Sequence, residues 1–570
     1  MLVERNKVRP RNTFVRRAWQ KKNSESISKS RTATKYLKLY CQYSSLNTLK
    51  YLVDSQRPLF ERLLWVTIHC IIVSFLVFMV YISYREFVTI PLITSMETDS
   101  YRTTNLDFPG IAICSVNRIS RQSASGLAID IFNSNVTRQS LDEILDAIEQ
   151  LGDLYPSDFD TIASRNVEID QLLTTYYKGP YNITDIMKDL TPKCTVILLK
   201  CKLHGSYRNC SNLFEFRKTQ DGFCCTFNYA RESDDILDMA YAIQPDVHQV
   251  MDLGIERGLT VVMDPLLDDY FYSILPTVGW KVLVFNPTDF PDMTSGGVTE
   301  VLAMPLTETF LDVSATAFVS TKSVESFPRE KRNCIFSDEN SPMRGSTMYT
   351  YSDCIVDCKI YYIQKFCGCR PFFYPRRGPK EYSWRICNNL DMECLVRHKS
   401  KWMIIFPHEE TGTIFQEKNA LHCKNCYPAC DDVSYDVLSW KSFMSVGGYN
   451  TNLLNYNVTN EGILHVYFSK YGTIKLKQDL SVYWYELMSD IGGICGVFIG
   501  FSFISVVEVL YFFALTFRDL LRKTSALHED NDREDEISSI QIQNPRTIHW
   551  RELHPRTWHS AKFSSNRPRY

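Results

Sequence analysis

Evenly spaced glycines between two acidic residues form the most chemically informative stretch of this sequence. Gly492, Gly496 and Gly500 recur every four residues, so a helix presents them on one face. Asp490 precedes this stripe, and Glu508 lies inside an otherwise apolar run, where a carboxylate is costly and usually faces a pathway or a partner. The two acids stand 18 residues apart, about five turns, and an unbroken helix would place them on one face. Rings of such acids, one from each subunit, would attract cations.

The glycine face has two physical interpretations. Small residues spaced by four let helices pack closely, and glycines also let backbone carbonyls approach a water-filled path. In an oligomer the same narrow face can serve both purposes: it packs against a neighbouring helix in its upper part and lines a conduit lower down. Each acid also has a simpler alternative: Glu508 would snorkel from near the membrane boundary, and Asp490 would cap the start of a helix.

Two long apolar stretches position these residues. Residues 63–84 include no charged side chain, and residues 491–517 include only Glu508. Roughly 20 apolar residues cross the hydrocarbon core of a bilayer, so we predict transmembrane helices at 63–84 and 485–517. The alternatives are buried core helices or, for the first stretch, a cleaved signal peptide, but that stretch begins too late and is too long.

The flanking charges orient both spans. Positive residues favour the cytoplasmic side. They precede the first span and follow the second: Arg57, Arg62, Arg518, Arg522 and Lys523. We therefore expect cytoplasmic tails at 1–62 and 518–570 and an extracellular segment at 85–484, in a plasma-membrane protein whose spans contact the lipid bilayer. The net charge of −2 gives no indication of a nucleic-acid partner.

The cysteines support an extracellular location for the central segment. Of 19 cysteines, 16 lie within residues 114–430. An even, dense set in one segment implies disulfides and an oxidising compartment. The alternative is zinc, because Cys423-x-x-Cys426 and Cys367-x-Cys369 have spacings that are typical of zinc ligands.

Two kinds of modification site are also predicted in this segment. Four Asn-x-Ser/Thr sequons predict N-glycosylation, and neither tail has one. They begin at Asn135, Asn182, Asn209 and Asn457. The run Arg329-Glu-Lys-Arg332 matches a dibasic processing site, with a chance match in an exposed loop as the alternative.

Alternating apolar runs and turns predict β-strands in the same segment. Residues 220–320 show this pattern throughout. Residues 108–114 read as an extended strand that enters a core, and residues 464–468 as a strand that returns to the membrane.

Helices are expected beside these strands. Ser140 and Glu143 form a capping box ahead of an apolar stripe, which predicts a helix at 140–151. A second helix is expected at 349–365, inside a block at 334–430 that holds ten cysteines. The predicted fold class is a membrane protein with two transmembrane helices around a large disulfide-rich α+β ectodomain.

These motifs resemble the degenerin/epithelial sodium channel family, and most closely its insect pickpocket branch, from about residue 36 to 515. The resemblance is carried by six motifs. They are Phe108-Pro-Gly-Ile-Ala-Ile-Cys114, Gly222-Phe-Cys-Cys-Thr-Phe-Asn228, Cys354-x3-Cys358, Cys367-Gly-Cys369-Arg-Pro371, Cys423-x2-Cys426-x3-Cys430 and Gly500-Phe-Ser502.

The resemblance implies a homo- or heterotrimer of related subunits, each with a β-sheet palm and helical thumb and finger elements. It implies sodium-preferring conduction that amiloride blocks, with Na⁺ as the permeant ion and no cofactor. It assigns the selectivity filter to Gly500, Phe501 and Ser502. It assigns the pore and gate to Ser489, Asp490, Gly492, Gly493, Gly496 and Glu508. Among these, Ser489 matches a small position where bulky substitutions hold related channels open.

The resemblance also implies a complete set of disulfides. In the thumb, from 334 to 430, it pairs Cys334–Cys430, Cys354–Cys426, Cys358–Cys423, Cys367–Cys394 and Cys369–Cys387. Elsewhere it pairs Cys114–Cys224 and Cys201–Cys210, which leaves Cys225 with Cys194. All 16 cysteines of the segment are then used.

One position departs from the family pattern. Asn47 and Thr48 stand where the family carries His-Gly before the first span. A Gly-to-Thr change removes backbone freedom, and a His-to-Asn change removes a titratable group. In the family this dipeptide supports gating and the inner pore, so the departure bears on whether the chain conducts by itself.

Four functions compete. The first is a conducting sodium channel subunit gated by an extracellular ligand or by force, which we expect in a sensory setting. Asn47 and Thr48 motivate the second, a non-conducting accessory or receptor subunit. An ATP-gated channel of the purinergic type shares the two-span plan, but the glycine stripe and thumb cysteines argue against it. An ectoenzyme is disfavoured because the sequence has no Gly-x-Ser-x-Gly, no His-Glu-x-x-His and no phosphate-cradling Gly loop with Lys.

Overall fold

The structure is a computed structural model. It describes residues 34–46, 49–54, 57–155, 166–231, 247–250, 252–339, 349–375, 385–406, 420–444, 459–519 and 521. The chain divides into two compact units. One unit spans Ile90–Val482, and the other combines Met1–Thr89 with Tyr483–Tyr570. Each unit is described by itself.

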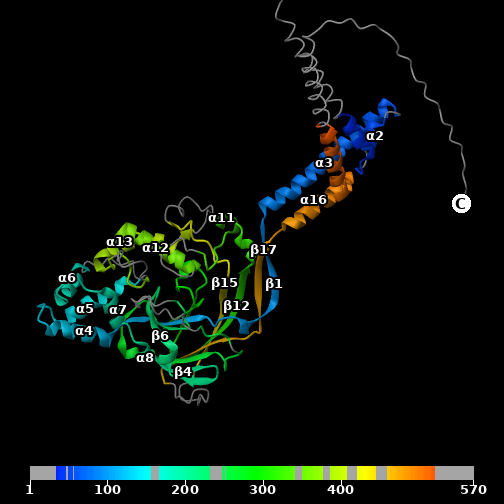
Figure 1. Ribbon diagram of the computed structural model, residues 1–570. Helices are drawn as coiled ribbons and strands as arrows, with labels where there is room; N and C mark the ends of the chain where they lie inside the picture. Colours follow the sequence, from blue (N-terminus) through cyan, green and yellow to red (C-terminus); the bar gives the residue numbers. More distant parts are fainter. Residues whose placement is uncertain are drawn as a thin grey trace, which may run out of the picture. The chain divides into compact units, whose positions relative to one another are not determined.

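The Ile90–Val482 unit is built on an eight-stranded sheet (Figure 1). Its strand order is β1 (Leu92–Arg102), β17 (Gly472–Leu480), β12 (Thr307–Ser320), β16 (Gly462–Phe468), β8 (Leu259–Met263), β4 (Leu198–Leu203) and β5 (Ser206–Arg208), and β15 (Asp432–Phe443) pairs with β12. Strand β12 runs parallel to β16 over its first half and parallel to β17 over its second half. Its other edge pairs antiparallel with β15 along nearly its whole length. The strand predicted at 464–468 is confirmed as β16.

A five-stranded sheet lies in the same unit. Its order is β11 (Thr299–Ala303), β10 (Trp280–Phe285), β2 (Gly110–Ser115), β7 (Gly222–Phe227) and β6 (Phe214–Thr219). Every residue of β2 and β7 is buried, which explains their apolar sequences. The strand predicted at 108–114 is confirmed as β2, and the β-pattern over 220–320 is confirmed by β7 to β12. Two short pairs complete the strands: β3 (Asn117–Ser120) with β9 (Tyr270–Ser273), and β13 (Ile405–Phe406) with β14 (Leu421–His422).

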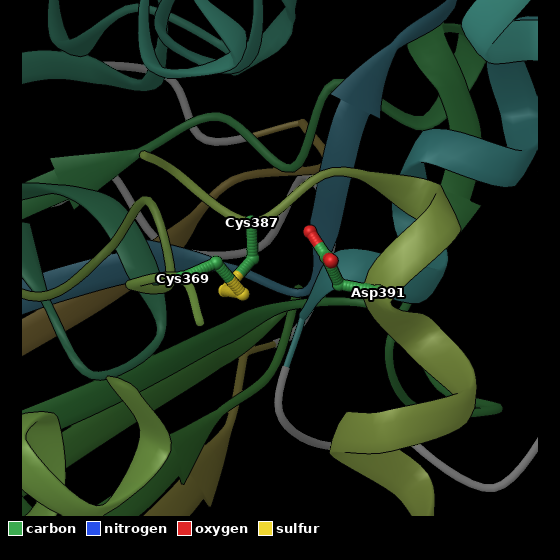
Figure 2. Close-up of side chains that lie close together, drawn as sticks. All are labelled: Cys369, Cys387 and Asp391. Carbon is green, nitrogen blue, oxygen red and sulfur yellow. A yellow bond between two sulfur atoms is a disulfide. The ribbon is translucent and has the colours of Figure 1, made fainter. Parts of the chain in front are cut away.

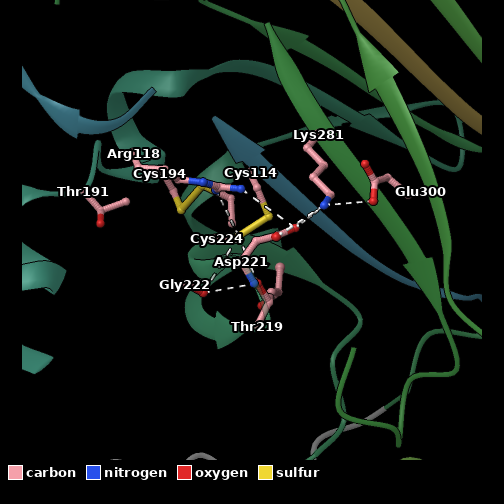
Figure 3. The surroundings of a disulfide bond; sticks show 12 residues. Cys114, Arg118, Thr191, Cys194, Thr219, Asp221, Gly222, Cys224, Lys281 and Glu300 are labelled. Atoms are coloured by element: carbon pink, nitrogen blue, oxygen red, sulfur yellow. Dashed lines mark hydrogen bonds and ion pairs between the residues drawn. A yellow bond between two sulfur atoms is a disulfide. The ribbon is translucent and has the colours of Figure 1, made fainter. Parts of the chain in front are cut away.

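Charged side chains tie the five-stranded sheet together beside the Cys114–Cys224 disulfide (Figure 3). The Nζ atom of Lys281 on β10 lies 3.0 Å from Asp221 and 2.8 Å from Glu300 on β11. The guanidinium of Arg118 on β3 lies 3.8 Å from the same Asp221 carboxylate, and its side chain is only 1% exposed. Two positive and two negative groups meet here, so the partly buried network is close to neutral.

Helices cover one end of this unit. Figure 1 shows α4 (Arg121–Asn133), α5 (Leu141–Glu149), α6 (Asn166–Tyr176) and α7 (Ile183–Leu190) gathered there. The remaining helices are short except for α12: α8 (Cys194–Ile197), α9 (Cys210–Leu213), α10 (Lys322–Glu325), α11 (Arg329–Arg332), α12 (Tyr351–Cys367), α13 (Met392–Arg397) and α14 (Lys399–Met403). The described residues also form the 3₁₀ turns η1 (Thr103–Asn105), η2 (Gln150–Leu154), η5 (Leu267–Asp269), η6 (Met293–Ser295) and η8 (Asn389–Asp391).

Both predicted helices form where the local signals place them. Helix α5 begins after Ser140, whose side chain accepts from the Glu143 N–H, while the Glu143 carboxylate accepts from the Ser140 N–H. This is the predicted capping box. Helix α12 begins after Thr350, which caps the Asp353 N–H, and ends at Gly368 in the left-handed conformation that favours glycine. The α+β, disulfide-rich character of the segment is therefore confirmed.

The two largest apolar cores formed by described residues both lie in this unit. One packs under α4 to α7 and α12, and includes Ile144, Ile148 and Ile355. The other lies against the two sheets, and includes Val261 and Val466. Sheet and helix faces thus bury separate apolar sets.

The second unit is helical. Its described elements are a helix at residues 34–43, α2 (Leu49–Val53), α3 (Leu59–Thr89), α16 (Trp484–Ile499) and the helix Phe503–Asp519. Helix α3 has 31 residues, is long and apolar enough to cross a membrane, and buries none of its side chains. It extends beyond the predicted span of 63–84 at both ends. The ring of Phe75 on α3 lies 5.4 Å from that of Phe498 on α16, so these two helices pack together.

Candidate functional site

The second apolar stretch is broken at the predicted filter tripeptide. Helix α16 ends at Ile499, and the helix Phe503–Asp519 continues at an angle of 76°. Gly500 adopts φ +69°, in the left-handed region where a side chain is costly. Its N–H donates to the Gly496 carbonyl at 3.0 Å, and the Phe501 N–H donates to the Cys495 carbonyl at 3.2 Å. The condition under which Asp490 and Glu508 would share one face, an unbroken helix, is therefore not met.

The two helices on either side of this break have the length and composition of a membrane span only when they are taken together. Such a bent pair is either a broken span or a re-entrant loop. Within the part of the chain that the structure describes, α3 is the single unbroken helix that meets the same criteria.

Serine side chains stabilise the far side of the break. The Ser502 N–H donates to Ser505 Oγ at 3.2 Å, and the Ser505 N–H donates to the Ser502 carbonyl at 3.0 Å. The first bond matches one half of a capping box, with a hydroxyl in the usual place of the carboxylate, and the second is an ordinary backbone turn bond. The tripeptide is thus held by backbone hydrogen bonds from α16 and by Ser505 from the following helix.

Glu508 has partners within the chain. Its Oε2 accepts from the Ser45 N–H at 2.9 Å and from Ser45 Oγ at 3.1 Å. The interpretation of Glu508 as a residue that faces a partner is therefore favoured over free snorkelling. Sequence reasoning missed Ser45, because nothing local links it to a residue 463 positions away.

The glycine face of α16 is open among the described residues of the chain. A Cβ added at Gly492 or Gly493 would meet no atom within 4 Å, and one at Gly496 would meet only the Phe501 carbonyl, at 3.6 Å. Helix α3 contacts α16 through Phe498 instead. None of the described residues therefore packs closely against the glycine face, which leaves it free for a neighbouring subunit or for a water-filled path.

Ser489 and Asp490 lie exposed inside α16. The start of this helix is at Trp484, where the Glu486 carboxylate accepts from the Tyr483 N–H at 2.9 Å. Asp490 is therefore not the cap of the helix, and that alternative is wrong. The predicted gating pair Asn47 and Thr48 lies outside the described residues, between Leu46 and α2.

Eight disulfides join the 16 cysteines of the Ile90–Val482 unit. The structure pairs Cys114–Cys224, Cys194–Cys225, Cys201–Cys210, Cys334–Cys430, Cys354–Cys426, Cys358–Cys423, Cys367–Cys394 and Cys369–Cys387. These are the pairs that the family resemblance implies. Cys41, Cys70 and Cys495 are free, and all three belong to the helical unit.

The disulfides also decide the zinc alternative. Within the described residues, one group of three metal-type side chains comes together, Cys369, Cys387 and Asp391 (Figure 2). Its two sulfurs are bonded to each other, so neither is a thiolate that binds metal. The Asp391 carboxylate is paired with Arg385 at 2.6 Å. Because the CxxC and CxC cysteines are likewise bonded in disulfides, the zinc alternative is wrong.

The dibasic run Arg329-Glu-Lys-Arg332 forms the short helix α11. Arg332 is only 2% exposed, and its guanidinium donates to the carbonyls of Cys334 and Glu325 and pairs with Glu339. A protease that recognises this arginine cannot reach it in the folded chain. The structure therefore disfavours a processing site here. The alternative had been a chance match in an exposed loop, whereas the run lies in a helix whose last arginine is buried.

Three of the four predicted glycosylation asparagines are described, and all three are exposed: Asn135, Asn182 and Asn209. Asn182 caps helix α7, because its Oδ1 accepts from the Thr184 N–H at 3.1 Å. Asn209 caps α9 in the same way, through the Ser211 N–H. Asn457 lies outside the described residues.

Asn182 allows glycan and cap to be separated. Thr184→Ala removes the sequon but keeps the cap, so we expect loss of one glycan with little change in stability. Asn182→Gln removes both, and loss of such a cap costs about 1 kcal/mol. The measurement is the gel shift on enzymatic deglycosylation together with the melting temperature of the full-length chain in detergent. An unchanged mass for Thr184→Ala would show that this sequon is unused.

The chain is similar along most of its length to known ion-channel proteins. A family model described as "Amiloride-sensitive sodium channel" matches residues 40–512. The chain is 25% identical over 491 residues to the Sodium channel protein Nach of Drosophila melanogaster, covering 84% of this chain and 87% of that protein. It is 26% identical over 541 residues to Pickpocket protein 28 of Drosophila melanogaster, covering 88% and 81%. It is 22% identical over 470 residues to the Bile acid-sensitive ion channel of Mus musculus, covering 80% and 83%.

Proposed function

The chain belongs to the amiloride-sensitive sodium channel family, and from that premise we propose that it is a subunit of a trimeric, sodium-preferring, amiloride-sensitive cation channel. This family consists of ion channels of the plasma membrane rather than enzymes. The proposal places both termini in the cytoplasm and residues 85–484 outside the cell. An extracellular ligand or a mechanical stimulus opens the channel, in a homo- or heterotrimer with related subunits.

The observation that carries the proposal is the break at Gly500-Phe501-Ser502. In three subunits, three such breaks meet around one axis and form the constriction. Unwound backbone at membrane depth is tolerated only where it is buried in protein or lines a water-filled cavity. Backbone carbonyls and small side chains there replace part of the hydration shell of a passing cation. The open glycine face of α16 lines the wider part of the same path or packs against the α16 helix of a neighbouring subunit.

The positions of aromatic residues support the proposal that both apolar segments cross the bilayer. Tyr483, Trp484 and Tyr485 cluster at the start of α16, with the Tyr483 and Tyr485 rings stacked at 5.3 Å. Tyr81 and Tyr84 are exposed in the last part of α3. Aromatic rings of this kind collect at membrane interfaces. We infer that these two sets mark the outer surface of the bilayer, which makes the bent pair a broken span with Asp490 near its outer end.

The proposal predicts that bulk at Ser489 opens the channel. Ser489 is exposed on α16 beside the glycine face. A large side chain there keeps the α16 helices of neighbouring subunits from approaching each other. We expect Ser489→Phe to give a standing current that amiloride blocks and that depends on external Na⁺, measured by voltage clamp of the expressed chain. Ser489→Ala is the matched control and gives no standing current.

Absence of current from Ser489→Phe would overturn the proposal if surface biotinylation shows normal delivery and related subunits do not restore it. A second candidate function, the non-conducting accessory subunit, rests on Asn47 and Thr48 in place of His-Gly. It predicts no current from Ser489→Phe alone and an altered current when a partner subunit is present. Restoring His-Gly at these two positions is expected to give current to a silent Ser489→Phe chain under the second function, whereas under the first function Ser489→Phe conducts without that change.

A further inference from the structure

A single side chain is buried in the described part of the helical unit. Ser505 is 0% exposed, whereas the other described residues of that unit are exposed or half-buried. Burying a hydroxyl costs free energy unless it is hydrogen-bonded. The partners of Ser505 therefore show how the fold compensates for this cost. Ser505 lies three residues after the last filter residue, Ser502.

The partners of Ser505 form a continuous hydrogen-bonded chain. The Ser45 and Ser505 Oγ atoms lie 2.9 Å apart. Ser45 also bonds to Glu508 through both its N–H and its Oγ. Each hydroxyl has one proton to donate. The order is therefore fixed: Ser502 N–H donates to Ser505, Ser505 donates to Ser45, and Ser45 donates to the Glu508 carboxylate.

Two further contacts place the 34–46 segment along the same helix. The Tyr40 ring lies 5.5 Å from that of Phe512, and the Tyr36 hydroxyl donates to the Asp519 carboxylate. Going from residue 36 to 40 to 45, the partner positions fall from 519 to 512 to 508 and 505. The segment before the first span therefore runs antiparallel to the helix after the filter, and Ser45 is its point of contact nearest the break.

We propose that Ser45 is a positioning residue for the filter: its bonds to Ser505 and Glu508 fix the first turn of the helix Phe503–Asp519 and so hold the break at Gly500-Phe501-Ser502. We call these three residues, Ser45, Ser505 and Glu508, the serine clasp. The inference rests on the proposed function. It also reassigns Glu508, whose carboxylate accepts hydrogen bonds in the clasp and does not serve as a free charge that attracts cations.

The electrical test measures the Na⁺/K⁺ permeability ratio from reversal potentials, in the Ser489→Phe background and with surface biotinylation. Ser45→Ala and Ser505→Ala each remove the bond between the two hydroxyls and one further bond. At about 0.5–1.5 kcal/mol for each bond, we expect each variant to lower the ratio by roughly fivefold or more. Because both variants break the same link, the double variant is expected to fall little further. Ser44→Ala is the control, since the Ser44 hydroxyl bonds only to the nearby Leu46 N–H in the clasp region.

Glu508 variants distinguish a clasp from a charge ring. Glu508→Gln keeps an acceptor oxygen and removes the charge, whereas Glu508→Ala removes both. The clasp predicts that Glu508→Gln retains selectivity and that Glu508→Ala loses it, as Ser45→Ala does. Equal losses from both variants, with Ser45→Ala unchanged, would overturn the proposal in favour of a charge ring.

A chemical test does not need current. In a background of Cys41→Ser, Cys70→Ser and Cys495→Ser, we expect Ser45→Cys with Ser505→Cys to form a disulfide under mild oxidation of the full-length chain in membranes. The measure is protection from maleimide labelling after the oxidised chain is unfolded without reductant, because Ser505 is buried in the folded chain. The matched pair Ser44→Cys with Ser505→Cys is expected to stay labelled. Failure of the first pair to cross-link overturns the clasp, whereas cross-linking without current from any variant refutes only the proposed function.

Discussion

Replacing Lys359 with Met is expected to lower the free energy of unfolding by about 3–5 kcal/mol, because it leaves a buried carboxylate without its partner. The Lys359 Nζ on α12 lies 2.8 Å from both carboxylate oxygens of Asp292, and the two side chains are 4% and 2% exposed. This pair joins the thumb helix to the turn that follows β10. Surface biotinylation and thermal melting of the full-length chain in detergent would measure the loss.

Lys365→Met is the matched control, since Lys365 lies exposed on the same helix. Lys359→Met with Asp292→Leu removes both charges and is expected to recover much of the stability. If Lys359→Met melts like Lys365→Met, the ion pair contributes nothing and the packing around α12 decides stability.

The same pair predicts a dependence on pH. Burial raises the pKa of Asp292, but the charge and hydrogen bonds of Lys359 and the bonds from Thr294 outweigh burial, so the pKa lies below its usual value. A lowered pKa gives stability that is fully present above the pKa of the unfolded chain and is lost as the pH falls through the folded value. We expect this acid-sensitive part of the stability to be missing in Lys359→Met.

The second large effect is expected at Gly500. Valine in the left-handed conformation costs about 1–2 kcal/mol or more, so Gly500→Val should reduce the population of the bent filter by roughly tenfold or more. We expect loss of sodium selectivity or of current, measured in the Ser489→Phe background. Gly500→Asn is the matched variant, because Asn tolerates this conformation better than a β-branched residue. Equal loss from Asn and Val would show that side-chain volume, not backbone conformation, decides the effect.

Much of the Ile90–Val482 unit could be predicted from local signals. The capping box of α5 and the apolar strand β2 follow from residue types and short spacings, and helix α12 forms close to the predicted range 349–365, although its Thr350 cap was not predicted. Such features depend on neighbours in sequence, so a single sequence reveals them. The disulfide pairs could not be predicted from local signals, because the spacing of the cysteines leaves many connectivities open. The family resemblance selected one of them.

The candidate site was harder to predict for a physical reason. Glycines at every fourth position have the spacing of a continuous helix, and nothing in that spacing shows that Gly500 leaves it. The break depends on hydrogen bonds that Ser505 makes to the tripeptide. The Ser45 contact joins residues 460 positions apart, and no local pattern encodes it. Tertiary contacts therefore decide the geometry of the site, whereas the sequence marks only its location.

The break also has a consequence for membrane thickness and hydration. Its two helices contain 16 residues, Trp484–Ile499, and the residues of Phe503–Asp519. Each falls short of the roughly 20 needed to cross a bilayer by itself. The last carbonyls of a helix have no partner within it, and hydrocarbon offers none. If the bent pair crosses the bilayer, as we propose, the carbonyls between the two helices need partners from water or from a neighbouring subunit. Where no protein group supplies them, we expect a hydrated pocket at this depth even in an assembly that passes no ions.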